Sequence, residues 1–190
     1  MMELNGNITL RYYGPELINV ESDPVTDDDL EWLPNLKPMM LKIMREAGGV
    51  GLAAPQVGVF KNFVLIELRN GTVIDLVNPE ITRLYGKETA AMEGCLSIPP
   101  AGNQCPVPRT EFIDIEAEGI LYERRKWKFT HEDARVVQHE LDHLTGTFFI
   151  DRVPEKKRRV VLEQFESWKR SMELGGSHAE NPGARTVSCR

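Results

Sequence analysis

Residues 130–146, THEDARVVQHELDHLTG, form the stretch that decides the fold. Apolar residues recur in it at helical spacing, which predicts an amphipathic helix with one buried face. Thr130 followed by Asp133 is typical of a helix N-terminus, and Gly146 is typical of a C-terminus. The apolar face consists of Ala134, Val137, Leu141 and Leu144. We therefore expect this helix to lie at the centre of the molecule, with the rest of the chain packed around it.

Two histidines of this helix, His139 and His143, are one turn apart and share a face. Two imidazoles so placed can hold one metal ion, and Glu140 can reach a water molecule bound to it. The alternative is that both histidines are hydrogen-bonded surface or core residues. Cys95, in the segment 93–97 (EGCLS), offers a thiolate as a third ligand. Three protein ligands leave one coordination position open, which is typical of a catalytic metal site.

A third segment, residues 49–58 (GVGLAAPQVG), is rich in small residues that allow the backbone to approach a substrate or another strand. Its only polar side chain is Gln56. The alternative is a tight loop that only turns the chain. Similarly, a lone cysteine such as Cys95 is more often a small buried hydrophobe than a ligand. The three segments therefore carry more weight together than each does alone.

The length of 190 residues suits one hydrophobic core, so we expect a single domain over residues 1–174 and a disordered tail over 175–190. The net charge of -6, with no basic patch interleaved with aromatic residues, argues against direct nucleic-acid binding. No apolar stretch is long enough to span a membrane, and the N-terminus lacks a secretory or transit pattern. We therefore expect a cytoplasmic protein. Its three cysteines are too few for a disulfide framework.

Alternating and β-branched segments in mid-chain, with helices on either side, predict an α+β fold. We expect mainly antiparallel short strands around the central helix, with N- and C-terminal helices. Asn70 and Gly71 indicate a hairpin turn. The expected strands are residues 8–11, 63–68, 72–77, 80–84, 112–118 and 121–129.

Prolines set the expected helix boundaries, because proline disrupts a helix interior. Pro34 and Pro38 predict a short helix ending near Trp32 and a second helix from about Pro38 to Gly48. A last helix is expected to begin near Pro154 and to end at residues 175–176. Its apolar face consists of Val161, Phe165, Trp168 and Met172.

In this order the three segments resemble those of the peptide deformylases: GLAAPQVG at 51–58, EGCLS at 93–97 and QHELDHLTG at 138–146. A weaker resemblance runs from about residue 8 to residue 152. That family removes the formyl group from the initiator methionine of nascent bacterial and organellar proteins. The resemblance implies an N-formylated peptide as substrate, and it suggests transient contact with the ribosome.

The resemblance also implies the site residues. Cys95, His139 and His143 would bind the metal, usually ferrous iron in cells, although the ligands also suit zinc, nickel or cobalt. Glu140 would be the general acid and base. The oxyanion would be bound by Gln56 and by the backbone amide of Leu96. The substrate backbone would pair as an added strand, and the substrate-binding residues would be Val50, Gly51, Glu93 and Gly94.

Two other classes of protein compete with this interpretation. Zinc endopeptidases share the two-histidine motif, but one subclass needs a histidine where this chain has Phe149. Another takes a glutamate from a later helix; Glu163 fits the spacing but lies opposite that helix's apolar face. Neither subclass explains Cys95 or Gln56. A metal-stabilised binding module would want a closed site, with Cys105 as the nearby fourth ligand.

Glu132 departs from the family, which usually has a large apolar residue lining the methionine pocket at this position. It lies two turns before His139, so we expect a more polar pocket. Either Arg135 pairs with the carboxylate and leaves the pocket open to methionine, or Glu132 favours polar or basic side chains in the substrate. The alternative is an exposed ion pair between Glu132 and Arg135 on the helix surface. The stretch 100–106 is also slightly longer than is usual in the family.

Overall fold

The computed structural model describes residues 8–100 and 104–174. Within this part of the chain, one antiparallel sheet has the strand order β1-β2-β3-β4-β5. The α+β prediction is confirmed. The strands are β1 (Gly51–Ala53), β2 (Phe63–Glu67), β3 (Val73–Glu93), β4 (Cys105–Gly119) and β5 (Tyr122–Thr130). The helices are α1 (Leu33–Glu46), α2 (His131–His143) and α3 (Glu155–Glu173), with 3-10 turns η1 (Asp27–Asp29), η2 (Ala54–Val57) and η3 (Phe149–Arg152).

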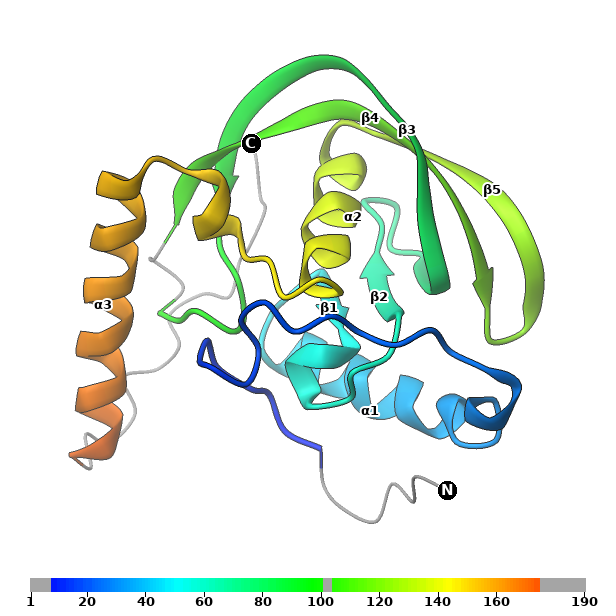
Figure 1. The fold of residues 1–190 in the computed structure, drawn as a ribbon, viewed down its shortest axis with the longest axis horizontal. Helices are drawn as coiled ribbons and strands as arrows, with labels where there is room; N and C mark the ends of the chain where they lie inside the picture. Colours follow the sequence, from blue (N-terminus) through cyan, green and yellow to red (C-terminus); the bar gives the residue numbers. More distant parts are fainter. Residues whose placement is uncertain (1–7, 101–103, 175–190) are drawn as a thin grey trace.

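The helix α2 occupies the centre of the molecule, beneath the curved strands β3 and β4 (Figure 1). The pair β1–β2 and helix α1 lie on its other side, and α3 stands at the edge. The whole span 134–143 of α2 is buried. Its apolar face packs into one cluster with the sheet residues Val64, Ile66, Leu76, Ile113 and Ile115. The sequence prediction of a central helix is therefore confirmed.

The ends of α2 differ in how well they match the prediction. Thr130 is the N-cap in an extended conformation, but its side chain makes no capping hydrogen bond. Asp133 instead accepts a hydrogen bond from the backbone N–H of Arg69, at 3.1 Å. Gly146 follows the helix with a φ of 64°, a conformation that glycine adopts at no steric cost. The tertiary contact to Arg69 has replaced the predicted local cap.

Helix α1 starts five residues before the predicted Pro38. Pro34 lies in the first turn, where a missing N–H costs nothing, but Pro38 lies inside the helix. The predicted short helix before Trp32 is only the 3-10 turn η1. The loss of one hydrogen bond at Pro38 is outweighed by burial along the whole length of the helix. The fully buried residues of α1 are Leu33, Leu36, Met40 and Met44.

Strands β3 and β4 extend beyond the predicted segments and pair as far as Glu93 opposite Cys105. Much of the second half of β3 is exposed, so the sequence there lacks the alternation that marks a half-buried strand. Hydrogen bonding to β4 holds this half of β3 in an extended conformation instead. Residues 8–11 do not form the expected strand; the N–H of Arg11 donates to the carbonyl of Gln56 at 2.6 Å.

Helix α3 begins after Pro154 as expected, and Val161 and Phe165 are buried on its inner face. Trp168 is half-buried and stacks on Phe165, whereas Met172 is 48% exposed, so the apolar face is shorter than predicted. The predicted helix stop at 175–176 and the predicted tail lie outside the described residues. None of the described helices is long and apolar enough to cross a membrane.

Candidate active site

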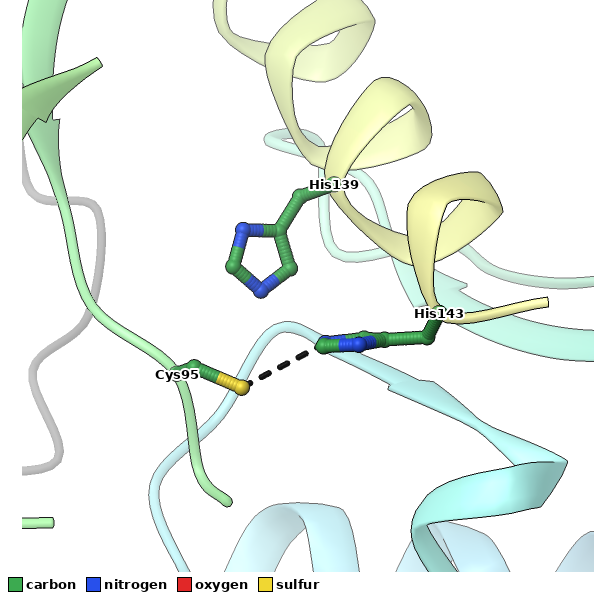
Figure 2. Close-up of side chains that lie close together, drawn as sticks. All are labelled: Cys95, His139 and His143. Carbon is green, nitrogen blue, oxygen red and sulfur yellow. Dashed lines mark hydrogen bonds between the residues drawn. The ribbon is translucent and has the colours of Figure 1, made fainter. Parts of the chain in front are cut away.

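The structure brings together the three predicted metal ligands. The ligand atoms of Cys95, His139 and His143 all lie within 4.8 Å of one another. Figure 2 shows the two imidazoles extending from α2 toward Cys95, which lies on the loop after β3. The Sγ atom of Cys95 is 3.3 Å from Nε2 of His143. The one-turn spacing on α2 therefore has the predicted effect of placing both rings on one face.

The buried carboxylate of Glu93 orients His139. Nδ1 of His139 lies 3.0 Å from Oε2 of Glu93, and because a carboxylate only accepts, Nδ1 carries the proton. Arg109 donates to the same carboxylate twice, from Nε at 3.0 Å and from Nη2 at 2.9 Å. Burial alone would raise the pKa of Glu93, but the bonds from His139 and Arg109 lower it to about 2. With Nδ1 bonded to Glu93, Nε2 is the ring nitrogen of His139 that can bind a metal.

The two histidines differ in their electrostatics. Burial lowers the pKa of His143 well below its usual value, and the positive charges of His139 and Arg109 lower it further. Burial also opposes protonation of His139, but hydrogen bonds with Cys95 and Glu93 raise its pKa. A neutral imidazole is the form that binds metal, so His143 is set for that role at neutral pH.

A further part of this network was missed by the sequence analysis. Nη1 of Arg109 donates to Asp142 of α2 at 2.6 Å, and Arg152 of η3 donates to both oxygens of the same carboxylate. Arg109 is on the inward face of β4, together with Cys105 and Val107. An arginine in register with buried residues of an alternating strand was the signal that could have identified it.

Glu140 lies beside the cluster and is 5% exposed. Its Oε2 is buried and has no hydrogen-bond partner among the described residues. Burial raises the pKa of Glu140 to about 7, although the charges of His139 and Arg109 oppose that rise. A carboxyl group with a pKa near neutrality can both take and give a proton at physiological pH.

The side chain of Gln56 also points to the cluster. Its Oε1 accepts the N–H of Ala53 at 2.9 Å, which fixes the orientation of the amide. Its Nε2 lies 3.1 Å from Oγ of Ser97 and 3.5 Å from Sγ of Cys95. The predicted oxyanion donor is therefore held next to the cluster by its own turn, η2.

A cleft of about 400 Å³, including its open mouth, runs along these residues. All seven residues predicted for catalysis and substrate binding line it. The cleft also includes Arg135, which the sequence analysis expected there only as the partner of Glu132, and Val136, which it did not expect. The lining residues are Gly49, Val50, Gly51, Gln56, Glu93, Gly94, Cys95, Leu96, Arg135, Val136, His139 and Glu140.

Glu132 is not among the residues that line this cleft, and the prediction that it would do so is wrong. Its carboxylate pairs with Arg69 at 2.6 Å rather than with Arg135. Arg135 turns inward instead and is almost fully buried. Arg69 follows β2, so it is distant in the sequence and this partner was not foreseen.

The residues present fit a catalytic metal. A thiolate and two imidazoles are a donor set that suits zinc or iron, and the buried Oε2 of Glu140 beside them still lacks a polar partner. Cys105 is not part of the cluster and packs in an apolar core with Val107 and Phe148. Glu163 is exposed and pairs with Arg159 at 3.7 Å. The ligands demanded by a closed site or by an endopeptidase are therefore not supplied by these residues.

Comparison with known proteins agrees with this geometry. The family model described as polypeptide deformylase matches residues 8–159. The peptide deformylase of Treponema pallidum (strain Nichols) is 36% identical over 166 residues, covering 82% of this chain and 94% of that protein. That of Natranaerobius thermophilus is 40% identical over 139 residues, covering 68% of this chain and 80% of that protein.

Solved structures show the same similarity. The peptide deformylase from Synechococcus elongatus, in complex with actinonin, has a TM-score of 0.77 and 32% identity, covering 87% of this chain and 90% of that chain. The peptide deformylase from Thermus thermophilus has a TM-score of 0.76 and 34% identity, covering 88% of this chain and 98% of that chain. The chain therefore belongs to the polypeptide deformylase family, metal-dependent hydrolases that deformylate nascent peptides.

Proposed function

We propose that Cys95, His139 and His143 hold a single divalent metal, ferrous iron in the cell, and that the cleft beside them is the deformylase active site. The observation that supports this most directly is the meeting of the three ligand atoms within 4.8 Å at the cleft. The donor set does not select iron over zinc, nickel or cobalt, so the choice of iron follows from the resemblance. A metal held there supplies Lewis-acid polarisation of water and of the formyl carbonyl.

Glu140 is the proposed general base and general acid. It takes a proton from the attacking water and gives it to the amine nitrogen as the C–N bond of the formamide breaks. Its pKa of about 7 supports this double role, because the group changes its protonation state readily at neutral pH.

Gln56 and the backbone N–H of Leu96 are the proposed donors to the oxyanion. The amide of Gln56 is already fixed by its bonds to Ala53 and Ser97, so it needs no reorganisation when charge develops on the substrate oxygen. Donors of this kind typically contribute about 3 kcal/mol each to transition-state stabilisation.

The substrate is the N-formylmethionyl end of a peptide, bound in extended form. Strand β1 stands first in the strand order, where it pairs with β2 on one side, and Gly51 at its start lines the cleft. We propose that the substrate backbone binds between Val50 and Gly51 on one side and the backbone of Glu93 and Gly94 on the other. Residues 1–174 would act as one catalytic domain in the cytoplasm, in transient contact with the ribosome.

The test is anaerobic purification followed by metal analysis and an assay on formyl-Met-Ala-Ser. We expect about one iron per chain and release of formate. A protein that carries metal yet releases no formate from this peptide would contradict the proposed activity. A protein that deformylates with the full occupancy of zinc after anaerobic purification would contradict only the choice of iron.

A further inference from the structure

Arg135 is a buried cation in the cleft wall that the mechanism above does not use. It lies on α2 one turn before His139, lines the cleft together with Val136, and has a side chain that is 6% exposed. Burying an arginine is costly unless its donors are satisfied, so its partners indicate what it does.

The guanidinium of Arg135 joins α2 to both long strands. Its Nη1 donates to Oε1 of Glu93 at 2.6 Å and to the carbonyl of Val107 on β4 at 2.7 Å. Its Nη2 donates to the carbonyl of Thr89 on β3 at 2.7 Å. Because these contacts occupy both Nη atoms, the methylene stem is the part of Arg135 that can offer an apolar surface to a group in the cleft.

The contact with Glu93 connects Arg135 to a metal ligand. Oε1 of Glu93 accepts a hydrogen bond from Arg135, and Oε2 of the same carboxylate accepts one from Nδ1 of His139. Arg109 also holds this carboxylate, but it is shared with Asp142 on the far side of the network. A change in the position of Arg135 therefore alters the position of His139 through one rigid group, the carboxylate of Glu93.

We propose that Arg135 is a positioning and specificity-determining residue that couples the side chain of the substrate's first residue to the metal centre. The proposal rests on the proposed function. A long unbranched side chain such as that of methionine packs against the stem of Arg135 and holds the guanidinium on Glu93. A small side chain leaves the stem unsupported, so that the orientation of His139 is less well fixed. The side chain of the substrate's first residue then affects the chemical step as well as binding, as interactions made in the transition state do.

Gln138 provides a matched control on the same helix. Its Nε2 donates to the carbonyl of Thr110 on β4 at 2.9 Å, and its Oε1 accepts Oγ1 of Thr110 at 3.2 Å. Gln138 is buried and joins α2 to β4, as Arg135 does, but it neither lines the cleft nor bonds to Glu93. Loss of Gln138 therefore disturbs the packing of α2 without disturbing the proposed connection.

The experiment compares wild type, Arg135→Met and Gln138→Met with two independent measurements. The first is kcat and KM for formyl-Met-Ala-Ser and formyl-Ala-Ala-Ser. The second is the cobalt dissociation constant by chelator competition, with the visible absorption of the Co(II) protein recorded before and after addition of the product peptide Met-Ala-Ser. The absorption of Co(II) reports its ligand geometry and does not depend on turnover.

We expect Arg135→Met to lower the ratio of kcat for formyl-Met-Ala-Ser to kcat for formyl-Ala-Ala-Ser roughly tenfold. The same variant should bind cobalt about tenfold or more weakly than wild type. Met-Ala-Ser should change the Co(II) spectrum of wild type and leave that of Arg135→Met nearly unchanged. Gln138→Met should keep the wild-type kcat ratio, cobalt affinity and spectrum. Equal effects in the two variants, or an unchanged kcat ratio and cobalt affinity in Arg135→Met, would overturn the proposal.

Arg135→Lys serves as the conservative variant, also in case Arg135→Met does not fold. It keeps a cationic donor to Glu93 but cannot reach Val107 and Thr89 with the same planar group. We expect it to retain cobalt affinity within about threefold of wild type. The reason is that the residue at this position acts on the ligand His139 through its bond to Glu93, and a lysine can keep that bond. A folded Arg135→Lys protein with no greater cobalt affinity than Arg135→Met would show a packing role alone and refute the connection. Failure of wild type to deformylate either peptide would refute the proposed function instead, and the cobalt measurements would still decide whether Arg135 acts on His139.

Discussion

Gly51 and Glu140 lie so close that a Cβ atom on Gly51 would sit 2.2 Å from Oε1 of the glutamate and 2.6 Å from its Cδ. No side chain fits between them. The carboxyl group of α2 therefore rests directly against the main chain of β1. The glycine of an edge strand thus determines where the proposed acid and base stands.

Gly51→Ala should displace Glu140 from this position. We expect the variant to keep its metal, because none of the three ligands moves, and to lose about 10²-fold or more in kcat through misplaced proton transfer. Steady-state kinetics with metal analysis measures both. Gly71→Ala is the control: it lies in open space at a φ of 81° and should cost about 1–2 kcal/mol in stability without loss of kcat. Normal turnover in Gly51→Ala would contradict this prediction.

Glu140→Gln should retain metal, lose about 10²–10⁴-fold in turnover and stabilise the metal-free protein in a pH-dependent way. The pKa of Glu140 is about 7 in the folded protein and 4.5 as a reference. The folded state therefore binds the proton more tightly, and stability is lost as the pH rises from about 4.5 through 7. Glu140→Gln has no ionisable group at this position, so its stability should not fall in this way as the pH rises.

Urea unfolding of metal-free wild type and Glu140→Gln measures the difference. We expect the variant to be more stable by about 3 kcal/mol at pH 8 and equal to wild type near pH 4. A difference that stays constant with pH would show that the buried carboxylate does not titrate in this range.

Cys95→Ala should abolish or greatly weaken metal binding, whereas Cys105→Ala should leave the metal content unchanged. Cys95 is one of the three clustered ligands, but Cys105 packs with apolar neighbours and burial raises the pKa of its thiol. Metal content after gel filtration distinguishes them. Cys105→Ala should still lower the free energy of unfolding by about 1 kcal/mol through lost packing. Metal loss from Cys105→Ala would instead support a closed structural site.

Gln56→Ala should lower kcat by about 10²–10³-fold with little change in KM, because its amide meets charge that develops only in the transition state. Ser97→Ala is the comparison, since it removes one partner of Gln56 while the bond from Ala53 still holds the amide. We expect Ser97→Ala to keep most of kcat. If Gln56→Ala loses thermal stability in proportion to activity, its role is to shape the turn η2.

Glu132→Leu should leave the preference among formyl peptides unchanged, in contrast to the expectation from the sequence. Glu132 is paired with Arg69 at the surface rather than turned to the cleft. Loss of an ion pair whose two side chains, Arg69 and Glu132, are 65% and 23% exposed should cost no more than about 1 kcal/mol. Relative turnover of peptides with methionine, glutamine and lysine at the first position measures the preference. A shift toward apolar side chains would mean that Glu132 faces the cleft in solution.

The sequence was sufficient to predict α2 and the meeting of His139 with His143, because both depend on local spacing. Cys95 could be named only as a possible third ligand from its own segment, and the roles of Gln56 and Gly51 followed from the resemblance to the deformylases. The helix itself has a periodic apolar face that few other structures would satisfy.

The errors arise where distant pairing decides the structure. Local spacing suggests nearby partners for Asp133 and Glu132, but each contacts Arg69, which a turn after β2 brings to the start of α2. Pro38 lies inside α1 because buried leucine and methionine side chains outweigh its local penalty. The bonds among Glu93, Arg109 and Asp142 require knowledge of which strand lies over which helix, and no spacing along the chain contains that information.

Strand β1 is only three residues long and stands at the edge of the sheet, so only backbone groups of one side remain for pairing with a further strand. The N–H and C=O groups in such an edge are the same for every amino acid. A peptide that pairs with β1 as proposed would be recognised by its extended backbone and not by its side chains beyond the first residue. In the proposed mode of binding, one short strand would therefore let the enzyme act on peptides of nearly any sequence after the first residue.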